Sequence, residues 1–430
     1  SGRVRSRAFD VSIVLFLMMA AFILAKTGRD AMFFQKNGLL DLPRASMAIA
    51  VLSLPMALAM LGLMQIAGPR PARIVSPLLM AAFLATYAFL ARPGGGGFMT
   101  VAYIMIPLAF GVLFSQAWLL GADLFEGAPR EELAHAYSWI GAASILGGVL
   151  GGAIAKFAAP HFEPYVLALF AATLLVAVSI CVARAQARHP LRYLKPGEGA
   201  AAPGFDDFRR VLHNRYSFLL LAVAMSAALA GTLVEFQFYI TASAAKQSGR
   251  QNADFFASFY LLLNAIAFLG QIYLMPRVQR AIGVMGSLFI LPGALLGLAG
   301  ALFVNASILL RSTLRVTEGG LKSSIHRSNW EQAYLALGRA ERSAAKLIVD
   351  GMGARLAEGA AALILFLWIR SAMPDGRTPE PGIQWITWVL VIAALTWITL
   401  TVFLRRSAAP ATAAGILESE ARLDIPIPDS

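Results

Sequence analysis

The sequence predicts an all-α membrane protein with about 12 transmembrane helices in two six-helix halves. Hydrophobic residues make up 58% of the 430 residues and charged residues only 14%. The mean hydropathy is +0.67, which is high for a water-soluble domain. Apolar stretches recur along the whole chain, and each is close to the ~20 residues that a helix needs to cross a bilayer.

Hydropathy, read together with the positions of Pro, Gly and charged residues, predicts the individual spans. Their ranges are 9–30, 46–67, 73–91, 98–122, 136–158, 164–185, 216–241, 253–275, 283–303, 305–325, 342–369 and 384–404. A polar stretch follows the sixth span. We therefore expect an N-terminal half at 1–190, a cytoplasmic linker at 191–215, a C-terminal half at 216–406 and a polar cytoplasmic tail at 407–430.

Basic residues in the loops are distributed unevenly between the two sides that this topology defines. The side with fewer of them holds only Lys36, Arg44, Arg92, Lys246, Arg250, Arg370 and Arg377. The positive-inside rule then places both termini and the linker in the cytoplasm, and we expect a bacterial inner membrane. Orientation signals account for most of the net charge of +12, so we expect no nucleic-acid partner.

Several classes of function lack their sequence signatures. The chain has no G-x-x-x-x-G-K-[ST] loop, which excludes a pump built on that nucleotide-binding loop. Its five histidines are scattered without the spacing of metal ligands. We therefore expect no enzyme activity, no cofactor and no metal.

Two six-helix halves joined by a cytoplasmic linker are the layout of the major facilitator superfamily, whose substrate site lies between the halves near the midplane. The short basic motif common in the loop after the second helix is poorly matched by Gly68-Pro-Arg-Pro-Ala-Arg73. This departure favours a divergent branch of that superfamily.

Charged residues inside the predicted spans are the strongest functional signal. A charge at membrane depth costs roughly 2.5–3.5 kcal/mol even on the lenient insertion scale. Four such residues lie in span ten at offsets that place them within about 60° on one helix face. They are Arg311, Arg315, Glu318 and Lys322.

Four more spans carry ionisable residues at membrane depth. They are Lys26, Arg29 and Asp30 in span one, Asp123 in span four, Glu235 in span seven, and Lys346 and Asp350 in span eleven. Salt bridges that only hold the helices together are one interpretation. A hydrated transport path is the other, because buried ion pairs stabilise less than apolar packing. The signs nearly balance, but arginine suits bidentate contact with phosphate or carboxylate, which favours an anionic solute.

Four blocks of sequence resemble the ATP/ADP translocases, the nucleotide transporters of plastids and intracellular bacteria. Lys26-Thr-Gly-Arg29-Asp30-Ala-Met-Phe-Phe resembles their first-helix signature. Gln116-Ala-Trp-Leu-Leu-Gly-Ala-Asp123 and Gly231-Thr-Leu-Val-Glu235 are similar to their fourth- and seventh-helix segments. Trp330-Glu-Gln-Ala-Tyr334, followed by Ala345-Lys346-Leu-Ile-Val-Asp350, is similar to "K-E-x-A-Y" and "G-K-A-A-I-D".

The resemblance implies an alternating-access nucleotide transporter whose critical charges are Arg29, Asp123, Glu235 and Lys346. Arg29 and Asp123 replace the lysine and glutamate of the family. The expected substrate-binding residues are Lys26, Arg29, Asp123, Glu235, Arg311, Arg315, Lys322 and Lys346. The expected gating or coupling residues are Asp30, Asp123, Glu235, Glu318 and Asp350. The expected partners are a nucleotide or other phosphorylated solute and the lipid bilayer.

Two other hypotheses remain open from the sequence. Proton-coupled uptake of another organic anion would use Glu235 or Asp123 as the proton carrier. A membrane sensor with a transporter fold would bind a ligand without moving it. A soluble regulatory domain following residue 430 is an expectation of this second hypothesis.

Overall fold

The computed structural model describes residues 2–36, 41–91, 96–125, 130–189, 209, 211–244, 249–337, 345, 347–372 and 380–423. Throughout these ranges the regular structure is helical, and no strand occurs in them. Ten helices of the described chain are long and apolar enough to cross a membrane. The predicted all-α membrane fold is confirmed.

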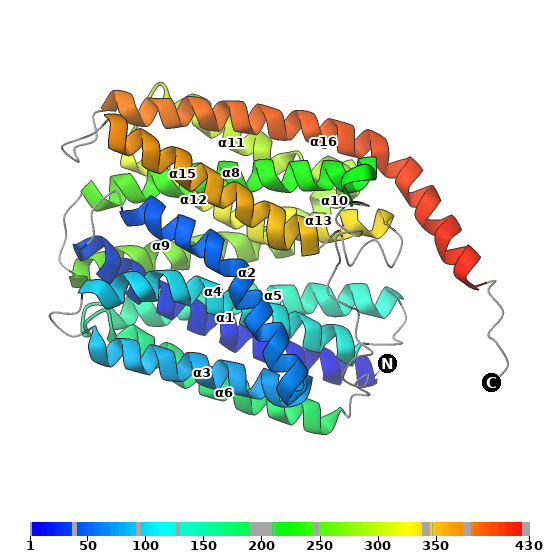
Figure 1. Cartoon of the computed structure of the whole chain (residues 1–430), viewed down its shortest axis with the longest axis horizontal. Coiled ribbons are helices and arrows are strands. Elements are labelled where there is room, and N and C mark those ends of the chain that lie inside the picture. Colours follow the sequence, from blue (N-terminus) through cyan, green and yellow to red (C-terminus); the bar gives the residue numbers. More distant parts are fainter. Residues whose placement is uncertain are drawn as a thin grey trace. The chain divides into compact units, whose positions relative to one another are not determined.

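Figure 1 labels the helices along the chain, and their contacts divide them into two compact units. Unit 1 comprises Ser1–Gly199 and Ser243–Leu269, and unit 2 comprises Ala200–Ala242 and Gly270–Ser430. This division follows contacts and not chain order alone, because helix α9 (Gly249–Leu269) is grouped with the N-terminal helices. The division into halves at 1–190 and 216–406 stays a prediction.

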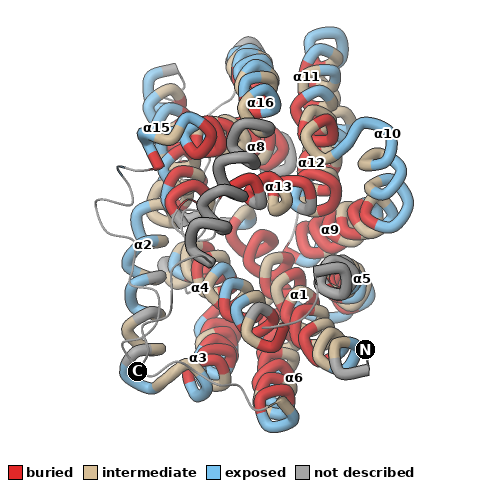
Figure 2. Tube along the Cα trace, turned by 90° about the vertical axis from the view of Figure 1, so that its right-hand side faces the viewer, coloured by how far each residue is buried: buried red, intermediate tan, exposed pale blue. Residues whose placement is uncertain are grey.

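Unit 1 is built around helix α1 (Gly2–Lys36). Helices α4 (Gly96–Leu124), α5 (Arg130–Ala158), α6 (Val166–Arg188) and α9 contact α1. Helix α3 (Pro69–Leu90) packs on α6, and α2 (Asp41–Ala67) packs on α4. Figure 2 shows buried residues along α1, α6 and α9. A central helix with so many neighbours needs apolar residues around most of its circumference, which the sequence of α1 provides.

Glycines bring α5 close to two neighbouring helices at once. A Cβ atom on Gly151 would lie 2.5 Å from the backbone oxygen of Ala20 in α1. A Cβ atom on Gly152 would lie 2.8 Å from Cα of Leu261 in α9. These glycines therefore allow close helix crossing.

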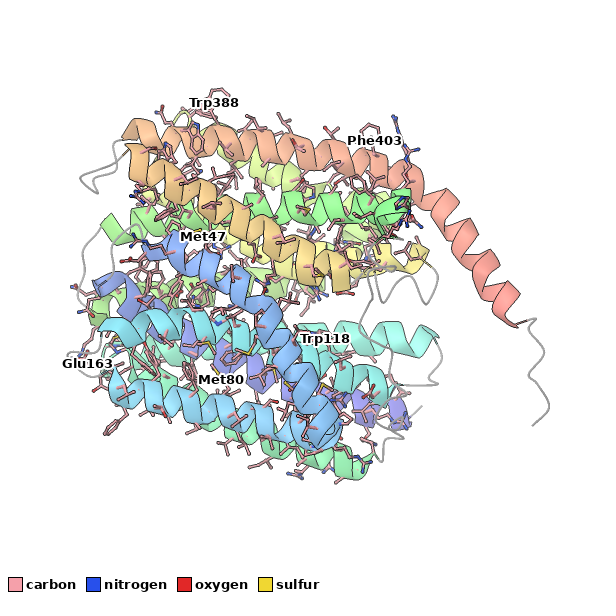
Figure 3. All side chains as sticks on the ribbon, in the orientation of Figure 1. Met47, Met80, Trp118, Glu163, Trp388 and Phe403 are labelled. Atoms are coloured by element: carbon pink, nitrogen blue, oxygen red, sulfur yellow. The ribbon has the colours of Figure 1, made fainter. Side chains whose placement is uncertain are left out.

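Two ion pairs join α9 to α5 and to the segment that follows α5. Lys156 lies 2.6 Å from Asp254. Arg250 lies 2.8 Å from Glu163, which is labelled in Figure 3. Both pairs are largely exposed, so each contributes little to stability.

The helices of unit 2 are interrupted more often than those of unit 1. Its elements are α8 (Arg215–Ala244), η1 (Gly270–Leu274), α10 (Met275–Ser287), α11 (Ile290–Leu302), α12 (Ile308–Leu321), η2 (Lys322–His326), α13 (Arg327–Ala333), η3 (Tyr334–Ala336), η4 (Leu347–Gly353), α15 (Ala354–Ala372) and α16 (Glu380–Leu423). The segments η1, η2 and η4 are π-helical. Such segments widen a helix locally and are frequent at functional sites.

The apolar surface of unit 2 is consistent with contact with lipid. Helix α16 packs on α11. Trp388 and Phe403, both labelled in Figure 3, are exposed on α16.

Within α10, Gly283 has φ of 72°, a left-handed conformation that a glycine adopts without strain. The bend at Gly283 therefore depends on the absence of a side chain.

We expect Gly152→Ala to lower the apparent melting temperature in detergent, because the new methyl group would meet the backbone of α9. Gly141→Ala is the matched control on the same helix, since a Cβ there meets nothing within 4 Å. The control should keep or raise stability, because Ala favours a helix by about 1 kcal/mol over Gly. Equal melting temperatures for the two variants would contradict the close packing of α5 and α9.

Candidate functional site

In unit 2, four charged side chains from α8, α12 and η2 form what we call the Arg315 cluster, comprising Arg315, Glu235, Glu318 and Lys322. The guanidinium of Arg315 donates to Glu318 and, at 2.9 Å, to Oε1 of Glu235. The Lys322 ammonium lies 3.3 Å from the second oxygen of Glu318. The predicted polar stripe on this helix therefore forms a connected ionic network.

The local sequence of α8 makes room for this network. Gly231 precedes Glu235 by one helical turn, so the two residues share a face. A Cβ on Gly231 would lie 3.0 Å from Oε1 of Glu318 and 3.3 Å from Nζ of Lys322. The glycine thus allows α8 to approach the charged face of α12.

Exposure of the side chains increases across the Arg315 cluster. Glu318 is 2% exposed, Arg315 13%, Glu235 37% and Lys322 50%. Arg311 lies one turn before Arg315 and is buried. A network that runs from a buried carboxylate to an open ammonium can transmit a change of charge from an accessible surface into the helices.

Unit 1 holds a second group, the Arg29 cluster, comprising Lys26, Arg29, Asp30, Tyr103 and Tyr260. Arg29 donates to Oδ1 of Asp30 at 2.7 Å and to the backbone oxygen of Tyr103 at 3.2 Å. The hydroxyl of Tyr260 in α9 donates to the other oxygen of Asp30. Both oxygens of this fully buried carboxylate are therefore satisfied.

Aromatic rings lie against the cations of the Arg29 cluster. The Arg29 guanidinium carbon is 4.1 Å from the centroid of the Tyr103 ring. The Lys26 ammonium is 5.1 Å from the centroid of the Tyr260 ring. Cation–π contacts of this kind compensate in part for the loss of water around a charge.

Asp123 lies in a different polar group from Arg29. Its Oδ2 accepts from Arg73 of α3 at 2.7 Å. Gln116, seven residues earlier on α4, donates to Ser76 of α3 at 3.2 Å. Gln116 and Asp123, seven residues apart on one face of α4, therefore both join α4 to α3.

Arg73 is the residue that the sequence analysis missed, because its position near a short loop suggested an orientation signal. Helix α3 begins at Pro69, which places Arg73 inside the helix, where it is 4% exposed. Its spacing of three from Ser76 was a signal that both face the same helix. The Arg73–Asp123 pair is a structural alternative to substrate binding by Asp123.

In unit 2, Asp350 is held by two aromatic side chains. Trp330 Nε1 donates to its Oδ1 at 2.9 Å, and the Tyr334 hydroxyl donates to the same oxygen at 2.8 Å. Lys346, predicted to bind substrate, lies outside the described residues. Among the described residues, no group of three or more His, Cys, Asp or Glu side chains is arranged to hold a metal ion.

We expect Arg315→Gln to destabilise the protein by about 1–3 kcal/mol, because it leaves the buried Glu318 with Lys322 as its remaining cation in the cluster. The double variant Arg315→Gln/Glu318→Gln should recover part of this loss, since no buried charge then lacks its partner. Thermal unfolding in detergent measures both effects. Additive losses in the double variant would contradict the coupling between these side chains.

Comparisons with known proteins identify the fold. No family model and no curated protein sequence matches the chain. A crystal structure of a mutant of the nucleoside transporter NupG is similar with a TM-score of 0.67 at 12% identity, covering 93% of this chain and 99% of that chain. A crystal structure of NupG itself gives 0.65 at 11% identity, with 92% and 98% covered. The protein is therefore an integral membrane protein with an all-α, major-facilitator-like fold.

Proposed function

We propose that the protein is an alternating-access transporter for nucleotides or related phosphorylated anions. The observation that carries this proposal is the Arg315 cluster, in which one guanidinium contacts carboxylates from two helices of a membrane fold. The finer assignment to a nucleotide comes from the resemblance of four sequence blocks to the ATP/ADP translocases. Cytoplasmic termini in a bacterial inner membrane belong to the same proposal.

The Arg315 cluster is better suited to exchange of partners than to stability alone. A buried ion pair adds little stability compared with apolar packing of the same volume. Glu235 is the more exposed of the two carboxylates on Arg315, so it is the partner that a ligand displaces at lower cost. A phosphate group can then take its place on the guanidinium through two hydrogen bonds.

This exchange gives the acidic residues a defined role. Glu235 neutralises Arg315 when no substrate is bound and is released when phosphate binds. Its return to Arg315 would favour release of the substrate. In unit 1, Asp30 is fully buried and neutralises Arg29, and Lys26 is the more accessible cation. Arg311 and Lys346 would extend the basic surface, and for Lys346 this role rests on the resemblance alone.

A neutral nucleoside is the second candidate substrate, and one observation favours it. Arg29, Arg315 and Lys322 each already contact a carboxylate, so the two clusters carry little excess positive charge. A nucleoside would need hydrogen bonds and aromatic contacts but no net charge. NupG, a nucleoside transporter by its description, has a similar fold, which is compatible with either substrate.

Counterflow in proteoliposomes tests the proposed function. We expect labelled ATP, ADP or AMP to enter vesicles loaded with the same unlabelled compound, with adenosine measured in parallel. Arg315→Gln should lower nucleotide counterflow about 10- to 100-fold, because a charged hydrogen bond contributes roughly 1.5–3 kcal/mol. Arg355→Gln is the matched control, since Arg355 pairs with Glu358 within α15 and is 42% exposed.

Each result of the counterflow measurement has one interpretation. Entry of adenosine alone would show that the substrate is a neutral nucleoside, the second candidate, and not a nucleotide. Binding of these compounds in a thermal-shift assay without any flux would support the sensor hypothesis. Absence of both binding and flux for all four compounds would overturn the proposed function.

A further inference from the structure

Helix α10 carries two basic residues that take no part in the clusters described above. Arg277 and Arg280 are exposed, and Figure 2 shows much of α10 in the pale blue of exposed residues. The sequence of α10 contains no aspartate or glutamate. Within the described part of the chain, both guanidiniums bond only to backbone oxygens, whereas Arg327 of the neighbouring α13 pairs with Glu331. The positive charge of α10 is therefore available to a partner from outside the described chain.

The two arginines lie on one face of the helix together with a tyrosine. Arg280 follows Arg277 by three residues and Tyr273 precedes Arg277 by four, so we call these three residues the Arg277 stripe. Nη1 of Arg277 donates to the backbone oxygen of Tyr273 at 2.6 Å, and Nε of Arg280 donates to that of Pro276 at 3.2 Å. Because a guanidinium has five N–H donors, each arginine keeps four for a ligand.

The packing of α10 on α13 directs the Arg277 stripe outward. Nε2 of Gln279 donates at 2.8 Å to Oδ1 of Asn329, which is fully buried. Gln279 follows Arg277 by two residues, which places the two side chains about 200° apart around the helix. Since Gln279 faces the interior of unit 2, the Arg277 stripe faces away from it.

The Arg277 stripe begins where the uncharged part of a candidate membrane span ends. This span is the apolar helical segment Gly249–Ser287. Between Asp254 and Arg277 it carries no charged residue, over a length close to the ~20 residues that cross the hydrocarbon. Arg277 and Arg280 therefore fall at the level of the lipid headgroups. An exposed tyrosine such as Tyr273 is typical of that level, because its ring is apolar and its hydroxyl reaches water.

Apolar side chains beside the arginines limit the class of partner. Ile272, Tyr273 and Leu274 are 43%, 57% and 45% exposed. A small soluble anion would contact the arginines but would leave these apolar side chains uncovered. A phospholipid contacts both, since its phosphate can accept two hydrogen bonds from a guanidinium and its acyl chains cover apolar side chains. Basic residues next to a membrane also attract lipids with a net negative charge.

We propose that the Arg277 stripe binds the headgroup phosphate of an anionic phospholipid. The two guanidiniums hold the phosphate oxygens, and Tyr273 packs its ring against the glycerol and the first acyl carbons. Helix α10 also contacts η2, the segment that begins at Lys322. A bound lipid therefore stabilises the packing of α10 on that segment.

Thermal unfolding of the full chain in detergent tests this proposal, with phosphatidylglycerol as the probe. We expect phosphatidylglycerol to raise the apparent melting temperature more than the same concentration of zwitterionic phosphatidylcholine, because a ligand of the folded state stabilises it. In Arg277→Gln/Arg280→Gln, the phosphatidylglycerol concentration that gives half of the effect should increase about 10- to 100-fold, since two basic residues near the headgroups are lost.

Arg405→Gln/Arg406→Gln is the matched control. It removes two exposed arginines of α16 that are predicted to lie on the same side of the membrane but are adjacent in sequence, so they do not share a helix face. This control should keep the response to phosphatidylglycerol. Arg277→Lys/Arg280→Lys should give an intermediate response, because an ammonium keeps the charge without the two-pronged contact. Melting temperatures without added lipid establish that each variant is folded.

Four results would overturn the proposal. An equal response of the wild-type protein and Arg277→Gln/Arg280→Gln would exclude the Arg277 stripe, and an equal loss in both double glutamine variants would indicate diffuse attraction in place of a site. An equal effect of glycerol phosphate, which has no acyl chains, would assign the stripe to a soluble anion. Binding of a polyglutamate peptide without a response to phosphatidylglycerol would assign it to an acidic protein. None of these measurements depends on counterflow, so the proposed function is tested separately.

Discussion

The cost of removing charged side chains from water is the constraint on which the rest of this structure depends. Within membrane-spanning helices each charge needs a partner, and the structure supplies partners from other helices. Arg73 of α3 pairs with Asp123 of α4, and Arg315 of α12 pairs with Glu235 of α8. The helix faces that packing brings together therefore have to carry complementary charges, while apolar residues around these pairs fill the remaining contacts.

The same pairs provide the chemistry that a transporter of anions requires. A cation that is already paired can exchange one carboxylate for a substrate oxygen without leaving a bare charge at any stage. Arg315, with two carboxylates of unequal exposure, is the clearest example. Among the described residues, Asp350 instead accepts hydrogen bonds from two neutral donors, Trp330 and Tyr334.

Local patterns in the sequence predicted most of the helices and the charged faces, but in place of the predicted spans 283–303 and 305–325 the described chain has the shorter helices α11 and α12. Hydropathy predicted the spans because the length of an apolar run is set by the membrane and not by neighbouring helices. The helical repeat predicted that Arg315, Glu318 and Lys322 share a face, which the ion pairs among them confirm. The glycines of α5 permit close crossing, since small residues at helical spacing leave a groove for another helix.

The partners of these faces could be decided only by the tertiary structure. The sequence placed Asp123 in a transport site, but it did not reveal Arg73 as its partner, because that pair joins two helices whose rotation is fixed by packing. The unsatisfied oxygen of Asp350 was equally invisible, since it depends on the positions of Trp330 and Tyr334. The sequence by itself determined that charges lie inside a helical membrane protein. Only the tertiary structure decided which charge meets which partner, because hydrogen bonds require distances that helical periodicity does not specify.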